Sequence, residues 1–268
     1  MRYMVSIMQP MDIKLLAEEL RVPYNLLNKL YDIPDELKDK KYNIYISKQF
    51  QEKDIDWDSI AGLASQLNVV VCLEDAVLAH AALEHELKWY WALPCTSWFE
   101  LYGLINNKAS EVFINGPLFF DLPKLSTICK EHNIQIRAVP NKAYDYYIPR
   151  DNGICGTYIR PEDVVIYEKY IDTLEFVSAN LTQEANLFDI YKVKGFWNGN
   201  LRLLIINLNK DVNNRGFDNR FAERRLSCKQ QCLKTNCKFC NLFFDFIRLT
   251  DERNTKKWLL EAQLEKKE

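Results

Sequence analysis

The chain has 268 residues, 48% of them hydrophobic and 13% aromatic, so it can bury a sizeable core and is not a disordered polypeptide. Its apolar runs, such as Val69–Leu73 and Leu203–Leu208, are too short to span a bilayer, and Met1–Pro10 lacks a charged region followed by a long apolar core. We therefore expect a soluble, unexported, cytoplasmic protein without a membrane partner, in which clustered cysteines bind metal rather than form disulfides.

The charge is distributed unevenly, although the net charge is only −2. Residues 210–240, here called the basic segment, hold eight Lys and Arg against three Asp and Glu, whereas residues 1–209 carry −7. An RNA or another polyanion is therefore expected to bind at the basic segment before any other part of the chain.

The predicted elements begin with a strand at Tyr3–Met8, followed by a helix that starts at Pro10 and continues through Leu20. Helices are also predicted at Trp57–Leu67 and Leu122–Glu131. Six further runs have the composition of strands: Asn43–Ile46, Val69–Leu73, Glu111–Ile114, Ile134–Val139, Thr157–Ile159 and Thr173–Val177. Repeated βα units of this number favour an α/β fold, a (β/α) barrel that is complete or lacks one strand.

Two stretches do not fit the repeat. An aromatic-rich stretch between Leu78 and Asn107 indicates a helical insertion, because it is longer than one crossover requires. Past Ala185 a helix is predicted to about Tyr191, and Leu201–Leu208 fits either strand or helix. We therefore divide the chain into a barrel at 1–208 and a metal segment at 209–268 that ends in a charged helix.

Four cysteines, Cys228, Cys232, Cys237 and Cys240, lie within thirteen residues with spacings of three, four and two residues. Four thiolates complete either a tetrahedral zinc site or a [4Fe–4S] cluster. The surrounding Lys and Arg side chains favour the thiolate form. The sequence predicts one metal centre here and leaves zinc and iron–sulfur open. The other four cysteines stand singly, so packing is expected for Cys72, Cys95 and Cys129, with Cys155 left open.

Three short motifs resemble the collagenase-like peptidase family, U-thirty-two. They are Tyr158-Ile159-Arg160-Pro161-Glu162-Asp163, then Leu174-Glu175-Phe176, and Asn214-Arg215 followed by Cys228 and Cys232. The family's next cysteine motifs are missing, because Val177-Ser178-Ala179-Asn180 stands in their place, and we expect Cys237 and Cys240 to replace those ligands.

The resemblance implies a barrel whose carboxyl-terminal strand ends face the metal segment. Some family members are iron–sulfur proteins that hydroxylate RNA bases or quinone precursors. We therefore expect a metalloenzyme that modifies a nucleic-acid base or another small planar, anionic substrate. Two alternatives remain open: a non-catalytic zinc protein that recognises nucleic acid or a protein assembly, and a peptidase. No Ser/His/Asp or Cys/His arrangement supports the peptidase.

The candidate site residues follow from strand ends and from charge. Arg160, Glu162 and Glu175 are the catalytic candidates, although a helix first turn accounts for Glu162, and an ion pair with Arg160 or Arg137 accounts equally for Glu175. Substrate-binding candidates are the loop residues Asn115, Asn141 and Asp151 and the basic-segment residues Arg215, Arg220, Arg224 and Arg225.

Overall fold

The computed structural model describes residues 1–114, 120–141, 158–176, 181–206, 222–223 and 226. Eight strands, all parallel, form a closed barrel in which each strand pairs with the next in sequence and the last pairs with the first. The strands are β1 Arg2–Ser6, β2 Glu19–Pro23, β3 Lys41–Ile46, β4 Asn68–Leu73, β5 Trp89–Trp91, β6 Glu111–Ile114, β7 Gln135–Ala138 and β8 Thr173–Glu175.

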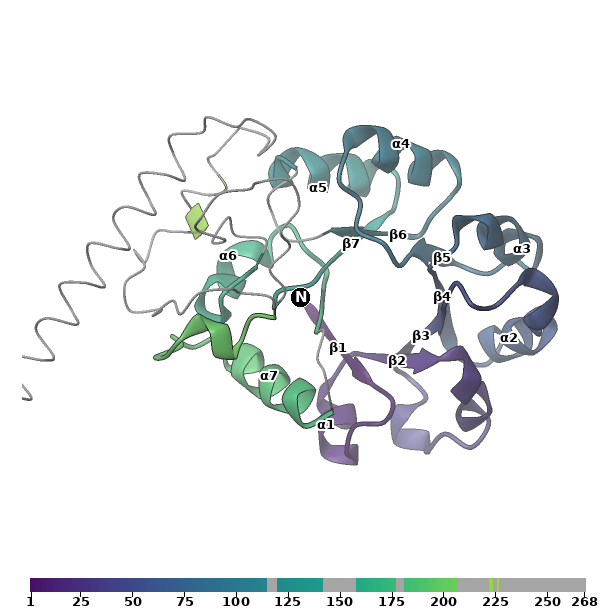
Figure 1. The fold of residues 1–268 in the computed structure, drawn as a ribbon, viewed down its shortest axis with the longest axis horizontal. Helices are drawn as coiled ribbons and strands as arrows, with labels where there is room; N and C mark the ends of the chain where they lie inside the picture. The colour runs from purple at the N-terminus through teal and green to yellow at the C-terminus, as the bar shows by residue number, and fades with distance from the viewer. Residues whose placement is uncertain (115–119, 142–157, 177–180, 207–221, 224–225, 227–268) are drawn as a thin grey trace, which may run out of the picture.

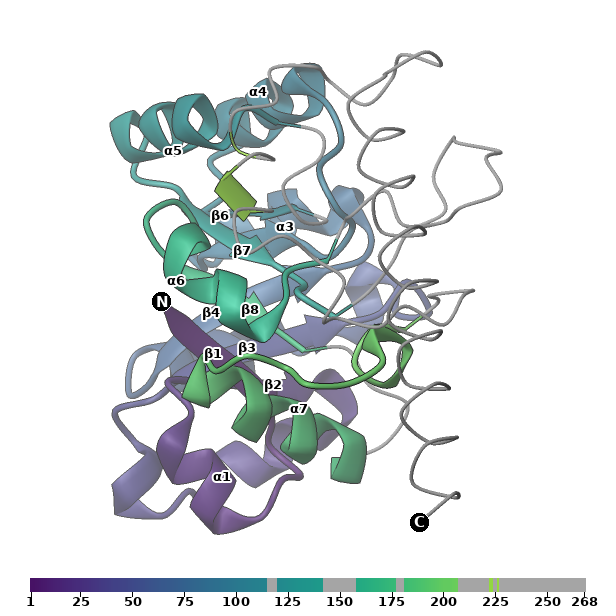
Figure 2. The ribbon, with the colours of Figure 1, turned by 90° about the vertical axis from the view of Figure 1, so that its left-hand side faces the viewer.

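Helices surround this ring on its outside (Figure 1). They are α1 Met11–Leu16, α2 Trp57–Ala64, α3 Ala79–Glu84, α4 Trp98–Asn106, α5 Leu122–Glu131, α6 Val164–Tyr167 and α7 Leu181–Val193. Short 3-10 turns, Tyr24–Leu30 and Asp35–Leu37, connect β2 to β3. Figure 2 shows α4 and α5 on one side of the strands and α1 and α7 on the other.

Side-chain caps fix where several of these helices begin. The carboxylates of Asp56 and Asp121 and the hydroxyl of Ser97 each accept a hydrogen bond from the backbone N–H three residues later, at the start of α2, α5 and α4 respectively. Such caps satisfy N–H groups that the helix itself leaves without a partner. The local sequence thus specifies where α2, α4 and α5 begin.

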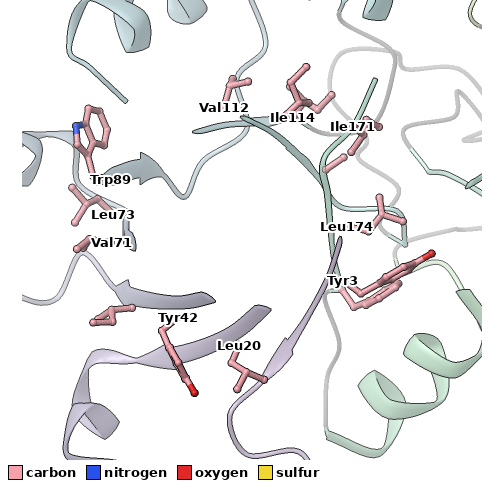
Figure 3. Packing of buried hydrophobic residues seen from close by; sticks show 14 of the residues in the cluster. Tyr3, Leu20, Tyr42, Val71, Leu73, Trp89, Val112, Ile114, Ile171 and Leu174 are labelled. Carbon is pink, nitrogen blue, oxygen red and sulfur yellow. The ribbon is translucent and has the colours of Figure 1, made fainter. Parts of the chain in front are cut away.

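The main hydrophobic core lies between the strands and the helices. Alternate residues of each strand, such as Leu20, Tyr42 and Leu174, point outward into this layer and are buried (Figure 3). The residues between them point into the barrel, where most are polar or charged. The outer layer therefore stabilises the fold, and the interior is left for polar groups.

The structure confirms a (β/α) barrel and shows it to be complete, but it corrects three predicted elements. The predicted helix through Leu20 is wrong, because α1 ends at Leu16 and β2 begins at Glu19. The helical insertion at 78–107 is also wrong, because this stretch contains the barrel strand β5 between α3 and α4. Tyr158 and Ile159 are not in a strand; the Ile159 N–H instead donates to Pro140 O at 2.8 Å.

The division at residue 208 stays a prediction, since almost all of 209–268 falls outside the described residues, including the predicted terminal helix. Within the described part of the chain, no helix has the length and apolar character needed to cross a bilayer.

Candidate functional site

A network of buried charges occupies the barrel interior on the side where the strands begin. Its centre is the Arg137 guanidinium of β7, which is fully buried and contacts Glu111 at 2.7 Å and Glu19 at 2.6 Å. Arg137 also donates to Asn43 Oδ1 at 3.0 Å, and its guanidinium lies 4.7 Å from the Tyr90 ring centroid. These contacts tie β2, β3, β5, β6 and β7 together through polar groups instead of the usual branched apolar layers.

The cations outweigh burial at Glu19. Burial raises the pKa of this carboxyl, but attraction to Arg137, Lys41 and Arg2 lowers it by more than burial raises it. The resulting pKa is about 2, against an ordinary 4.5. Thr173 donates to Glu19 at 2.9 Å and Asn43 donates to it at 3.0 Å. Glu19 is therefore a fixed negative charge at neutral pH, and its oxygens are saturated with donors.

Above this network, three charged groups meet at the carboxyl-terminal ends of the strands, a region we call the mouth. Arg21 of β2 donates through Nη1 to Glu175 and through Nη2 to Glu184, both at 3.2 Å. The side chains of Arg21 and Glu175 are 25% and 15% exposed, whereas Glu184 is buried at 2%. Substrates of such barrels bind at this end, so these accessible charges are placed where chemistry is expected.

Glu184 is held in place by the chain that leaves β1. It accepts from the Ser6 N–H at 2.9 Å and from Gln9 Nε2 at 3.3 Å, and the same Gln9 nitrogen donates to Leu181 O at 2.8 Å. Gln9 is buried and its Oε1 has no hydrogen-bond donor among the described residues. The α7 carboxylate is thus positioned rigidly against Arg21.

One wall of the barrel interior is apolar and aromatic. Val70, Cys72 and Tyr90 form a buried cluster against which the half-buried Tyr45 packs. Burial raises the pKa of the Cys72 thiol and of the Tyr90 hydroxyl well above their ordinary values, so both are neutral at pH 7. Tyr45 donates from its hydroxyl to Glu74, which leaves its ring as the aromatic surface of this wall.

The predicted catalytic residues fall in two places. Glu175 lies at the mouth, where the predicted ion pair with Arg137 is present at 3.7 Å. Arg160 instead is buried against its own helix turn, with Asp163 at 2.6 Å and Glu162 at 3.3 Å. These ion pairs give Arg160 and Glu162 a structural role. A catalytic role for either residue stays a prediction.

The predicted substrate-binding residues are mostly beyond what the structure describes. Asn141 is described and is fully buried, with its carbonyl accepting from Ile206 N–H at 2.8 Å. The remaining candidates lie outside the described residues: Asn115, Asp151, Arg215, Arg220, Arg224, Arg225, Cys155, Cys228, Cys232, Cys237 and Cys240.

The three isolated cysteines that are described confirm the packing prediction, since Cys72, Cys95 and Cys129 are all buried. Among the residues with described positions, no group of three or more His, Cys, Asp or Glu side chains is arranged to hold a metal ion. The prediction of a four-cysteine metal centre thus continues to rest on the sequence.

Sequence reasoning missed Arg21, Glu184 and Glu19. The first and third are hidden because the predicted helix covers the start of β2; the alternation of Glu19 and Arg21 with Leu20 and Val22 is the signal that could have found them. Glu184 lies in a helix whose pattern gives no sign that this residue is buried.

The fold and the mouth together define a protein of the eight-stranded (β/α) barrel class with a charged interior. No protein-family model and no curated protein matches the chain. Similar solved structures include phosphoribosyl anthranilate isomerase from Thermotoga maritima, with 9% identity, a TM-score of 0.45 and coverage of 72% of this chain and 97% of that chain. A U32 peptidase has 11% identity, a TM-score of 0.41 and coverage of 67% and 93%. The second is a peptidase of the family that the motifs resemble, and the barrel assignment itself rests on the strand pairing.

Proposed function

We propose that this protein is a barrel metalloenzyme that modifies a planar, nitrogen-containing ring, such as a nucleic-acid base, at the mouth. The observation that carries the proposal is the pair of accessible charges, Arg21 and Glu175, at the carboxyl-terminal strand ends of a barrel whose deeper charges are buried and paired.

The chemistry of the mouth favours a substrate that donates hydrogen bonds. The described charges there are one guanidinium and two carboxylates, and Glu175 is the carboxylate that keeps solvent access. A carboxylate accepts well from ring N–H and exocyclic amino groups, as in base recognition. Glu175 would hold such an edge by accepting its hydrogen bonds, while the ion pair with Arg21 at 3.2 Å keeps the carboxylate oriented.

Two further features fit a base as substrate. The half-buried ring of Tyr45 provides a face on which a planar ring can stack. The phosphates of an RNA would be met by the basic segment, residues 210–240, whose sequence carries a local +5. A small-molecule ring without phosphates would use the mouth alone.

The metal part of the proposal rests on Cys228, Cys232, Cys237 and Cys240. A [4Fe–4S] cluster bound there would supply single-electron transfer. The reaction we propose is hydroxylation: dioxygen, two electrons from an external donor and two protons convert a ring C–H into C–OH and release water. With zinc in place of the cluster, redox chemistry is absent, and the spacing of the four thiolates then favours a non-catalytic nucleic-acid-binding role.

One preparation tests both parts. Protein purified without oxygen should contain iron and absorb broadly across the visible range. RNA incubated with this protein, an electron donor and dioxygen should yield nucleosides heavier by one oxygen atom. Glu175→Gln should abolish the oxygen addition without loss of iron. The matched control is Glu168→Gln, which removes a half-exposed carboxylate paired with Lys194 away from the mouth and should modify RNA normally.

If the purified protein contains zinc and no iron, the hydroxylase proposal is rejected and the non-catalytic nucleic-acid-binding role is kept. Full modification by Glu175→Gln would reject the mouth as the site, whatever the metal.

A further inference from the structure

A polar pocket lies at the end of the barrel opposite the mouth, where the strands begin. It has a volume of about 170 Å³ and is lined by the first residues of five strands, among them Arg2, Lys41 and Gln135. This volume accommodates roughly five or six water molecules. The pocket is separated from the mouth by the buried network around Arg137 and takes no part in the function proposed above.

The pocket carries an excess of positive charge. Its lining includes three cations, Arg2, Lys41 and Lys88, against one carboxylate, Glu111. Lys41 is buried and forms an ion pair with Glu111, so these two charges cancel. The deeper Glu19 is shared between Arg137 at 2.6 Å and Arg2 at 3.2 Å, so four cations stand against two carboxylates at this end of the barrel.

The pocket also offers donors that the fold does not use. Gln135 Oε1 accepts from Arg2 at 2.6 Å and from Lys41 at 3.2 Å, which fixes its amide so that Nε2 is a donor without a partner in the described part of the chain. The side chains of Lys88 and Asn68 are exposed at the rim of the pocket and make no hydrogen bond or ion pair to any described residue. Arg2 uses only part of its five N–H groups on Glu19 and Gln135.

A structural role explains only some of these residues. The pairs of Arg2 with Glu19 and of Lys41 with Glu111 join strands at this end, as polar groups at the lower face of a barrel usually do. Lys88 and Asn68 contribute nothing to that joining. A cavity with two surplus positive charges and several unused N–H donors is the complement of a small dianion.

We propose that this pocket binds a phosphate group, as inorganic phosphate or as part of a small phosphate ester. Lys88 and Arg2 provide the charge, and Gln135 and Asn68 donate to the phosphate oxygens. Phosphate matches the surplus of two charges and presents acceptor oxygens in several directions, as the donors around the cavity require.

The test is calorimetric titration of the full-length protein at low salt with inorganic phosphate and, separately, with glycerol phosphate. One site per chain should be filled, and Lys88→Gln should weaken binding roughly tenfold or more, since it removes a hydrogen bond from a charged donor. Lys88→Arg should retain binding. The matched control is Lys53→Gln, because Lys53 is exposed and does not line the pocket; it should bind normally.

The better ligand of the two identifies the source of the phosphate. Tighter binding of inorganic phosphate assigns the pocket to the free ion, and tighter binding of the ester assigns it to a phosphorylated small molecule. Unchanged affinity in Lys88→Gln, or loss of binding on replacing Arg224 and Arg225 of the basic segment, would overturn the proposal.

Discussion

Replacing Arg137 by methionine isolates the contribution of the buried network to stability. The substitution keeps a long side chain inside the barrel but removes the guanidinium that contacts Glu19 at 2.6 Å and Glu111 at 2.7 Å. Both carboxylates are nearly or fully buried, so they cannot turn to water to recover the interaction.

The expected loss of stability follows from what remains around the two carboxylates. Removing one partner of a buried ion pair destabilises a protein by about 3 to 5 kcal/mol. Lys41 still contacts Glu111, and Arg2 still contacts Glu19, so we expect a value near the lower end of that range. This is a large fraction of a typical total stability and corresponds to a fall in Tm of roughly 6 to 12 °C.

The pH dependence gives a sharper signature. Because the pKa of Glu19 is lowered to about 2 from an ordinary 4.5, it contributes ~3 kcal/mol above pH 4.5, and this stabilisation is lost as the pH falls towards 2. Without Arg137 the folded-state pKa of Glu19 rises, so the variant has less of this stabilisation to lose. The difference in stability between wild type and variant should therefore shrink below pH 4.5.

Urea unfolding followed by circular dichroism at pH 7, 5, 4 and 3 measures this difference directly. Lys194→Met is the control, because it breaks a half-exposed pair with Glu168 and should change stability by less than about 1 kcal/mol. A destabilisation at pH 7 no larger than that of the control, or a difference that is constant from pH 7 to 3, would refute the reasoning.

Three further predictions concern other parts of the chain. Cys232→Ser should lose the bound metal, measured by elemental analysis, because all four thiolates are needed for one centre; full occupancy would contradict the single-centre hypothesis. Trp89→Ala should lower the unfolding free energy by about 3 to 5 kcal/mol in urea titrations, since this buried ring fills the layer between β5 and the helices. Arg224→Ala with Arg225→Ala should weaken RNA binding and reduce its salt slope by about one for each phosphate that is no longer neutralised, measured by fluorescence anisotropy at several salt concentrations; an unchanged slope would exclude these residues from the interface.

The sequence predicts the barrel where each element carries its own pattern. Glu111–Ile114 and Leu122–Glu131 are predicted with the bounds that the structure has, because a short apolar strand and a capped amphipathic helix are both locally distinct. β5 could not be found in this way. It has only three residues, all aromatic, and helices on both sides, so its strand character comes from pairing with β4 and β6.

The sequence predicts a site residue only where it also predicts the strand that carries the residue. Glu175 and its partner Arg137 lie on predicted strands, and their ion pair follows from neighbouring positions in the sheet. Glu19 and Arg21 were missed because the predicted helix runs through Leu20, although their alternation with Leu20 and Val22 has the period of a strand and not of a helix. A strand-end position predicts Arg160 at the mouth, but Asp163, three residues later, provides the local partner that the structure uses.

The closure of the barrel has a consequence for how the chain folds as it is synthesised. β1 pairs with β8, with Arg2 opposite Thr173. The barrel therefore cannot close until β8, the last strand in the sequence, has left the ribosome. An open sheet of seven strands exposes its inner surface during this interval. Much of that surface carries the charges of Glu19, Lys41, Glu111 and Arg137, so the inner face of the unfinished sheet stays largely hydrated, and the unpaired edges of β1 and β7 are where another nascent chain could pair before β8 arrives.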